Sequence, residues 1–209
     1  MRLLVIQTAA MGWELLQRHG GAAARLPFPL EAAEPPFPAV TCTAQAVFRT
    51  GLAPEATGVI CNGRFDPAGR RVDFWNQSAR LVQGERIWQE ARAAGCRVGL
   101  CFWQQSLGEA ADLILSPAPI HHHHGGMIQD CYCRPRDLYG RLCRDVGRPF
   151  NLRHYWGPMA SFKASRWIAD AMRCLLGMPE TAPELLLTYL PHLDYALQKH
   201  GPEDRKSVV

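Results

Sequence analysis

The sequence predicts an α/β fold in which a mostly parallel sheet is flanked by helices on both faces. Two observations support it. Short apolar segments alternate with segments of helical periodicity, and several apolar segments are continuous, as in strands buried on both faces. The length of 209 residues allows a sizeable core, and we expect residues 1–209 to form a single domain.

The first elements lie near the N-terminus. Residues 2–6 (RLLVI) are short and apolar, and they predict a buried first strand. A helical stretch follows from Trp13 to Arg18, and Gly20-Gly21 is expected to end it. Residues 26–38 are rich in proline, which breaks both helices and strands, so we expect a loop there.

Two further helices are expected before residue 96. One runs from about Thr43 to Thr50, and either Thr41 or Thr43 would cap its N-terminus. The other covers residues 84–95, where apolar side chains share one face and a glycine can end the helix. That face consists of Ile87, Trp88, Ala91 and Ala94.

The alternation continues in the second half of the chain. Residues 97–103 and 111–117 predict strands, and residues 118–134 have no regular pattern. Helices are expected near 135–145 and 162–176, the latter with an apolar stripe. The stripe consists of Ala164, Ile168, Ala171, Met172 and Leu175.

Composition restricts the class of protein. The net charge of +4 is mild and its basic residues are scattered, so we expect no nucleic-acid polymer as a partner. No apolar run approaches membrane-spanning length. The eight cysteines show no paired spacing, and several lie in apolar segments, which favours free thiols in a reducing compartment. We therefore expect a cytoplasmic protein; the pattern leaves the oligomeric state open.

One candidate for chemistry is the stretch AVTCTAQAVFRTG, at residues 39–51. A short extended piece leads to Thr41 at the start of the expected helix, and helix starts offer free N–H groups and partial positive charge to a phosphate. A threonine hydroxyl held there could attack phosphorus once its proton is removed. The alternative is a threonine that only caps the helix.

A second candidate is Asp194, just past ELLLTYLP (residues 184–191), which predicts a continuous apolar strand. Ligands gather at the carboxyl ends of such strands, and a carboxylate in the polar turn there could bind a metal. The alternative is an aspartate that only caps the turn.

These two segments resemble the type I phosphodiesterase/nucleotide pyrophosphatase family of the alkaline phosphatase superfamily. The first matches its nucleophile region from Phe-Pro through Thr-Gly-Leu to an Asn, and the second its Asp followed by Gly-Pro, here Gly201-Pro202. The resemblance implies Thr41 as nucleophile and metal ligand, Asn62 as donor to the phosphoryl oxygen and Asp194 as zinc ligand. It further implies two zinc ions and a small phosphorylated substrate.

The chain departs from the family pattern at the metal ligands. Ala9 stands where the family has a metal-binding Asp, and Gln198 stands where it has a His; His200 lies two residues further on. The remaining ligands come later in the family than Val209, so we expect an alkaline-phosphatase-like N-terminal portion. The alternative to a metal-dependent hydrolase is a non-catalytic relative or inert fragment that at most binds a phosphorylated ligand.

Two other features have a functional and a structural interpretation. HHHHGG (residues 121–126), followed by Cys131 and Cys133, could form an adventitious metal site or a solvated loop. The tryptophans are expected in core and rim packing, and the alternative is a nucleobase slot at Phe74-Trp75 or Tyr155-Trp156.

Overall fold

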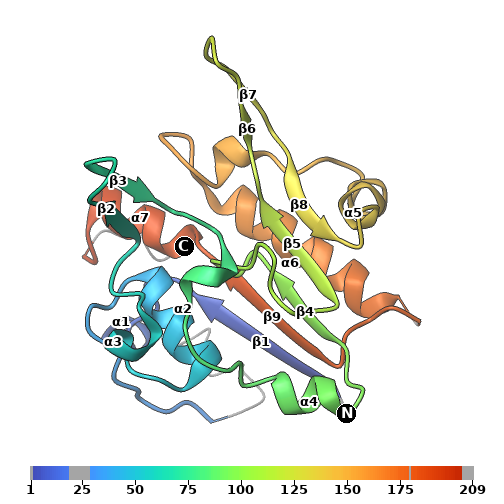
Figure 1. Ribbon diagram of the computed structural model, residues 1–209, viewed down its shortest axis with the longest axis horizontal. Coiled ribbons are helices and arrows are strands. Elements are labelled where there is room, and N and C mark those ends of the chain that lie inside the picture. The colour runs from blue at the N-terminus through green and yellow to red at the C-terminus, as the bar shows by residue number, and fades with distance from the viewer. Residues whose placement is uncertain (1, 19–28, 179, 204–209) are drawn as a thin grey trace.

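The computed structural model describes residues 2–18, 29–178 and 180–203, and a five-stranded sheet forms its centre (Figure 1). The strand order is β1-β9-β4-β5-β8. Their bounds are β1 (Leu3–Thr8), β4 (Val98–Cys101), β5 (Leu113–Pro117), β8 (Cys131–Arg134) and β9 (Leu185–Leu190). All pairs are parallel except β5–β8, which is antiparallel, so the prediction of a mostly parallel sheet is confirmed.

Strand β9 lies between β1 and β4, where both of its edges are paired. Leu185 pairs with Leu3 on one side and with Val98 on the other. Four of its six residues are buried, and every residue of β4 is buried. This placement explains why both segments are continuously apolar, because side chains on both faces are covered.

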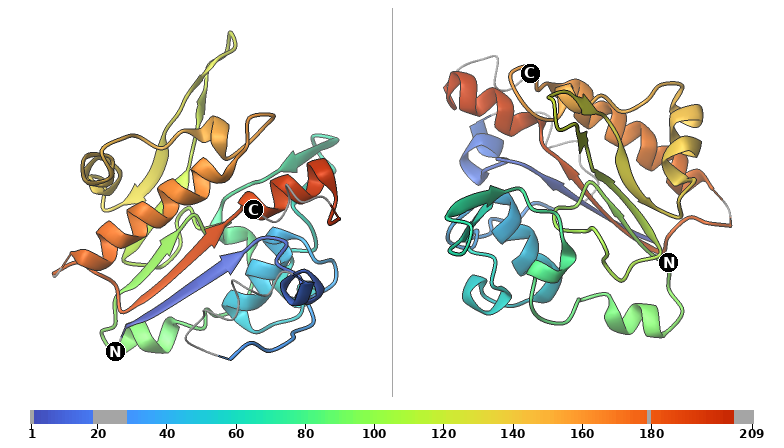
Figure 2. Two further views of the ribbon diagram at one scale, coloured as in Figure 1. Left: turned by 180° about the vertical axis from the view of Figure 1, so that it is seen from behind. Right: turned by 45° about the horizontal axis from the view of Figure 1, so that its top comes forward.

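One face of the sheet is covered by α5 (Leu138–Val146) and α6 (Phe162–Gly177), which lie on the same side in both views of Figure 2. The predicted stripe of α6 is buried in full. It packs on side chains of alternate strand residues and on an aromatic group, as expected for a period of two along each strand. The packed group includes Cys101, Leu113, Leu115, Leu186, Phe102, Phe150 and Trp167.

The opposite face has a smaller core centred on Trp88 and Trp103. The helix predicted over 84–95 is wrong in extent, because α4 covers only Gln89–Ala93. Trp88 is 1% exposed, but Ile87 of the same predicted face is 52% exposed. A short helix suffices because one large indole fills the space against the sheet.

The prediction of a buried first strand is wrong. Strand β1 pairs only with β9 among the described residues, and Leu3, Leu4 and Ile6 are all exposed. Helix α1 (Trp13–Arg18) follows it, and the glycines expected to end α1, Gly20-Gly21, lie outside the described residues. The described part of the proline-rich segment, residues 29–38, forms neither helix nor strand, as predicted.

Two hairpins and three short helical elements complete the described part. The hairpins are β2 (Gly63–Asp66) with β3 (Arg71–Phe74), and β6 (Ile120–His121) with β7 (Met127–Ile128), which projects away from the sheet in Figure 1. The helical elements are α3 (Pro54–Thr57), η2 (Ala79–Leu81) and η3 (Leu152–His154). Residues 118–134 are therefore not irregular, because they hold three short strands.

Helices α2 (Thr41–Thr50) and α7 (His192–His200) lie at the end of the sheet where β1 and β9 terminate (Figure 1). Within the described residues, no helix combines the length and apolar character needed to cross a membrane. Because of their position, helices α2 and α7 bring residues from distant parts of the sequence to one edge of the sheet.

Candidate active site

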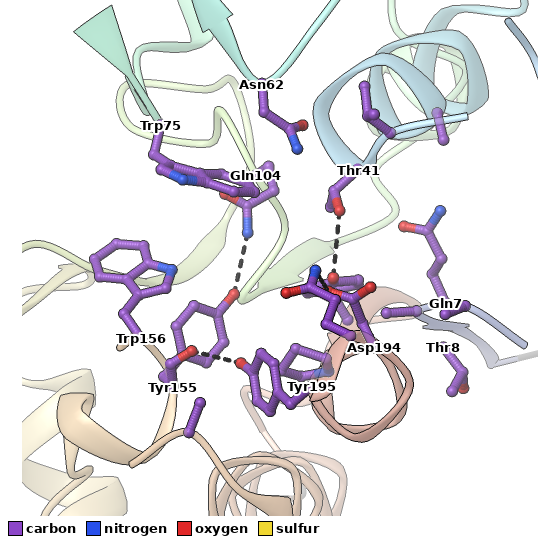
Figure 3. Close-up of a pocket in the computed structure, with 18 of the residues that line it drawn as sticks. Gln7, Thr8, Thr41, Asn62, Trp75, Gln104, Tyr155, Trp156, Asp194 and Tyr195 are labelled. Atoms are coloured by element: carbon purple, nitrogen blue, oxygen red, sulfur yellow. Dashed lines mark hydrogen bonds between the residues drawn. The ribbon is translucent and has the colours of Figure 1, made fainter. Parts of the chain in front are cut away.

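A pocket of about 570 Å³ opens at the carboxyl ends of β1, β9 and β4 (Figure 3). Each strand contributes residues at or after its end: Thr8 ends β1 and Ala9 follows it, Pro191 follows β9 and Gln104 comes after β4. This is the edge of a parallel sheet where ligands bind, because the chain leaves the strands there and side chains are free to converge.

Thr41 is the first residue of α2 and lines this pocket. The residue before it, Val40, is extended and makes no side-chain cap, so the prediction that Thr41 or Thr43 caps the helix is wrong. The Thr41 hydroxyl lies 3.4 Å from the Tyr189 hydroxyl (Figure 3). The hydroxyl of Thr43, by contrast, is buried without a hydrogen-bond partner in the described structure.

Asn62 faces the same pocket after α3. Its Oδ1 accepts a hydrogen bond of 2.9 Å from the backbone N–H of Cys42, the second residue of α2. A backbone N–H can only donate, so the Asn62 oxygen is turned to the helix and the Asn62 amide nitrogen points into the pocket (Figure 3). The structure thus places the Thr41 hydroxyl and the Asn62 amide group at the same pocket.

Asp194 also lines the pocket, but the polar turn predicted around it is wrong, because Asp194 lies in the first turn of α7. Its Oδ2 accepts a hydrogen bond of 2.8 Å from the side-chain amide of Gln198, one helical turn later. Burial and the Asp194 charge raise the pKa of Tyr189 to about 12, so the hydroxyl next to Thr41 stays protonated at neutral pH.

The donor set does not fit a two-ion zinc site. Asp194 is the carboxylate of the pocket, Ala9 offers no ligand atom, and Gln198 donates its amide hydrogen to Asp194. His200 is exposed at the end of α7 and does not line the pocket. Across the described residues, no group of three or more His, Cys, Asp or Glu side chains could hold a metal. A zinc site needs about four donors, and here Asp194 and Thr41 supply two.

The histidine loop forms no metal site within the described residues either. His122, His123 and His124 are exposed at the tip of the β6–β7 hairpin. Cys131 is buried in β8, where burial raises the pKa of its thiol well above the ordinary value, and a protonated thiol is a poor ligand.

Three aromatic residues line the side of the pocket away from Thr41 in Figure 3. Trp75, Tyr155 and Trp156 face it, whereas Phe74 is 68% exposed on the β2–β3 hairpin. Trp88, Trp103 and Trp167 are buried in the two cores. Core packing therefore explains Trp88, Trp103 and Trp167, whereas Trp75 and Trp156 are available to contact a ligand.

Sequence reasoning missed several pocket residues, among them Gln104, Tyr189, Tyr195 and Lys199. A signal existed for Gln104, because polar residues directly follow a buried strand there, as they do at Asp194. Lys199 and Asp194 are the charged residues among those that line the pocket, so the site has one cation and one anion.

The sequence model of one protein family, described as "Type I phosphodiesterase / nucleotide pyrophosphatase", matches residues 4–208. A search of curated proteins found no match. Among solved structures, murine ectonucleotide pyrophosphatase/phosphodiesterase 5 is similar with a TM-score of 0.59 at 15% identity. That match covers 100% of this chain and 48% of the murine chain. An inactive variant of the murine protein was solved in complex with AMP.

Phosphonoacetate hydrolase from Sinorhizobium meliloti 1021 is similar as well. Its complex with phosphonoacetate gives a TM-score of 0.64 at 16% identity, and its complex with phosphonoformate gives 0.63 at 15%. Both matches cover 100% of this chain and 50% of the hydrolase. The fold is thus alkaline-phosphatase-like, and the chain spans about half the length of these structures.

Proposed function

Because the chain belongs to the type I phosphodiesterase/nucleotide pyrophosphatase family, we propose that it carries the nucleophile of a hydrolase that cleaves phosphodiester or nucleotide pyrophosphate bonds in a small phosphorylated substrate. The observation that carries this proposal is the arrangement of Thr41 and Asn62 at the start of α2. The Thr41 hydroxyl is not used as a cap, and the Asn62 amide N–H points into the same pocket.

The proposed reaction is a displacement at phosphorus by Thr41. A bond forms between Thr41 Oγ and phosphorus, the bond to the leaving oxygen breaks, and water later hydrolyses the phosphorylated threonine. The Asn62 N–H and the N-terminus of α2 are suited to stabilise the charge that develops on the phosphoryl oxygens. The Thr41 proton passes to the leaving oxygen, which departs with it, and Tyr189 holds the Thr41 hydroxyl in place before the attack.

A divalent metal remains a proposal, with zinc as the first ion to test. Bound zinc would lower the pKa of the threonine hydroxyl, and Asp194 and Thr41 are the donors that this chain offers. These two donors do not complete a zinc site. Isothermal titration with zinc, on the wild type and on Asp194→Asn, measures whether this chain binds it.

The test of the nucleophile compares two threonines of one helix. We expect Thr41→Ala to abolish hydrolysis of bis(p-nitrophenyl) phosphate, measured with and without added zinc, and Thr41→Ser to retain part of it. Thr43→Ala is the matched control, because Thr43 lies two residues later, is buried and does not line the pocket. Full hydrolytic activity of the Thr41→Ala variant would refute the proposed displacement by Thr41.

A non-catalytic relative is the second candidate. Two observations favour a pocket that binds a phosphorylated ligand without hydrolysing it. The Gln198 amide is hydrogen-bonded to Asp194, and the Ala9 side chain has no ligand atom. This candidate predicts phosphate binding with no tight zinc site. The inert-fragment alternative predicts poor solubility instead, and the exposed apolar residues Leu3, Leu4 and Ile6 of strand β1 favour it.

We also propose a reducing, cytoplasmic environment for the chain. All eight cysteines are free, and Cys42, Cys101 and Cys131 are buried. Free buried thiols are typical of proteins that do not pass through an oxidising compartment. Thiol labelling of the protein in intact cells, compared with labelling after reduction, tests this proposal.

A further inference from the structure

A chain of hydrogen bonds runs behind the aromatic side of the pocket, which Trp75, Tyr155 and Trp156 form. The donor and the acceptor of each bond can be assigned, so the chain has a defined direction. It begins at Gln77, whose Oε1 accepts from the backbone N–H of Gln105 at 2.8 Å. Its Nε2 donates to the backbone carbonyl of Trp75 at 3.1 Å. A backbone N–H can only donate and a carbonyl can only accept, so both ends of the Gln77 amide are assigned without ambiguity.

The orientation of the Gln77 amide fixes the next two hydrogen bonds, which lead to the pocket. Gln77 Nε2 also donates to Gln104 Oε1 at 2.6 Å, so the oxygen of the Gln104 amide is turned toward Gln77. The nitrogen of the same amide therefore faces the other way, and it donates to the Tyr155 hydroxyl oxygen at 3.0 Å. The Tyr155 oxygen accepts, and its own O–H proton is left to donate elsewhere.

Tyr155 is held rigidly in this position. Its side chain is 2% exposed, and its ring packs against Phe102, Phe150 and Trp156 at centroid distances of 5.5, 5.8 and 5.3 Å. The Tyr195 hydroxyl donates to its backbone carbonyl at 2.5 Å. Burial raises the pKa of Tyr155 well above the ordinary value of 10, so the hydroxyl keeps its proton at neutral pH.

Within the part of the chain that the structure describes, the Tyr155 hydroxyl accepts from Gln104 and its own proton has no acceptor. Figure 3 shows the hydroxyl on the pocket side of the ring, directed toward Gln104. A buried donor without an acceptor is unfavourable, so this wall of the pocket is complementary to an oxygen that a ligand brings. Asn62 presents a second oriented donor from the α2 side.

We propose that the Tyr155 O–H is the donor of a second subsite, which takes an oxygen acceptor on the organic group of a phosphate ester. The ester's phosphoryl group lies at Thr41 and Asn62, and for that placement the inference rests on the proposed function. Trp75 and Trp156 flank the organic group. The ligand class is thus a phosphate ester with a carbonyl or hydroxyl oxygen on its organic part, in contrast to one with a bare hydrocarbon.

The test measures the binding of three probes to wild type and Tyr155→Phe by isothermal titration. The probes are inorganic phosphate, phenyl phosphate, which has no acceptor beyond the phosphate, and uridine 5′-monophosphate, which has several. We expect wild type to bind the uridine ester more tightly than phenyl phosphate. Tyr155→Phe should weaken the uridine ester by about three- to tenfold, as for one lost hydrogen bond, and leave the other two unchanged.

A second variant tests the direction of the chain without touching a pocket residue. In Gln77→Glu, the carboxylate can accept from the Gln105 N–H but cannot donate to Gln104, so the Gln104 amide turns over. Its oxygen then accepts the Tyr155 proton, and the selective loss for the uridine ester should recur. Gln77 does not line the pocket, so a general loss of packing would weaken all three probes alike.

The proposal is overturned if Tyr155→Phe weakens phenyl phosphate as much as the uridine ester, or weakens neither. It is also overturned if wild type does not prefer the uridine ester. Such a result, together with hydrolysis that depends on Thr41, would reject the subsite and leave the proposed function standing. Wild type that binds none of the three probes would reject the phosphoryl site and the subsite together.

Discussion

Replacing Arg49 with methionine is expected to lower the free energy of unfolding by about 3 to 5 kcal/mol. Arg49 lies on α2, eight residues after Thr41, and its side chain is fully buried. Its guanidinium donates to the backbone carbonyls of Gln104 and Gln105, the latter at 2.8 Å. It also lies 3.5 Å from the Glu109 carboxylate.

The magnitude follows from which partners would be left unpaired. Within the described residues, the carbonyls of Gln104 and Gln105 accept hydrogen bonds from Arg49 alone, and each charge-assisted bond contributes about 1.5–3 kcal/mol. Glu109 is not orphaned, because Arg86 donates to the same carboxylate oxygen at 2.7 Å. Burial lowers the pKa of Arg49 to about 9, and the removal of this desolvated charge offsets part of the loss.

The assay is urea denaturation at pH 7, followed by tryptophan fluorescence. Arg148→Met is the matched control, because Arg148 forms a 2.9 Å ion pair with Asp170 but its side chain is 52% exposed. Exposed pairs contribute about 0–1 kcal/mol, so the control should unfold nearly as wild type. Equal stability of the two variants would refute the reasoning that the buried arginine clamps the loop that carries Gln104.

Two further predictions concern stability. Burial raises the pKa of Asp112, but the hydrogen bonds from Arg92 and from the Val98 N–H, together with the Arg92 charge, outweigh it and leave the pKa below its ordinary value of 3.8. The unfolded chain then binds the proton more readily, so the stabilisation is complete above pH 3.8 and is lost as the pH falls through the folded value. The stability difference between wild type and Asp112→Asn in urea melts should shrink below pH 3.8, and a constant difference would contradict this. Gly99→Ala should cost about 1–3 kcal/mol because its Cβ would lie 2.9 Å from Leu186 Cδ1, whereas Gly177→Ala, with open space, should not destabilise.

Local pattern was sufficient for the elements whose environment matches their sequence. The buried stripe of α6 and the continuous apolar strand β9 were both predictable, because each is covered along its whole apolar surface. Strand β1 shows the limit of this reasoning. Its residues are as apolar as those of β9, yet it lies at the sheet edge and Leu3 and Ile6 are exposed. Apolar character alone does not reveal how many neighbours a strand has.

The candidate site divides in the same way. Thr41 and Asp194 could be placed in one pocket from sequence, because each follows a segment that leads to the carboxyl edge of a parallel sheet. The orientation of Asn62 could not, since it depends on the N–H of Cys42, twenty residues away.

The hydrogen-bond chain behind the pocket could not be predicted from any local sequence pattern. Gln104 meets Gln45, Gln77 and Tyr155, which are 59, 27 and 51 residues distant in the sequence. Residue type and spacing predict helices and strands because those rest on neighbours within a few positions. A directed donor arises only when packing brings distant polar groups within about 3 Å, since hydrogen bonds are short and directional.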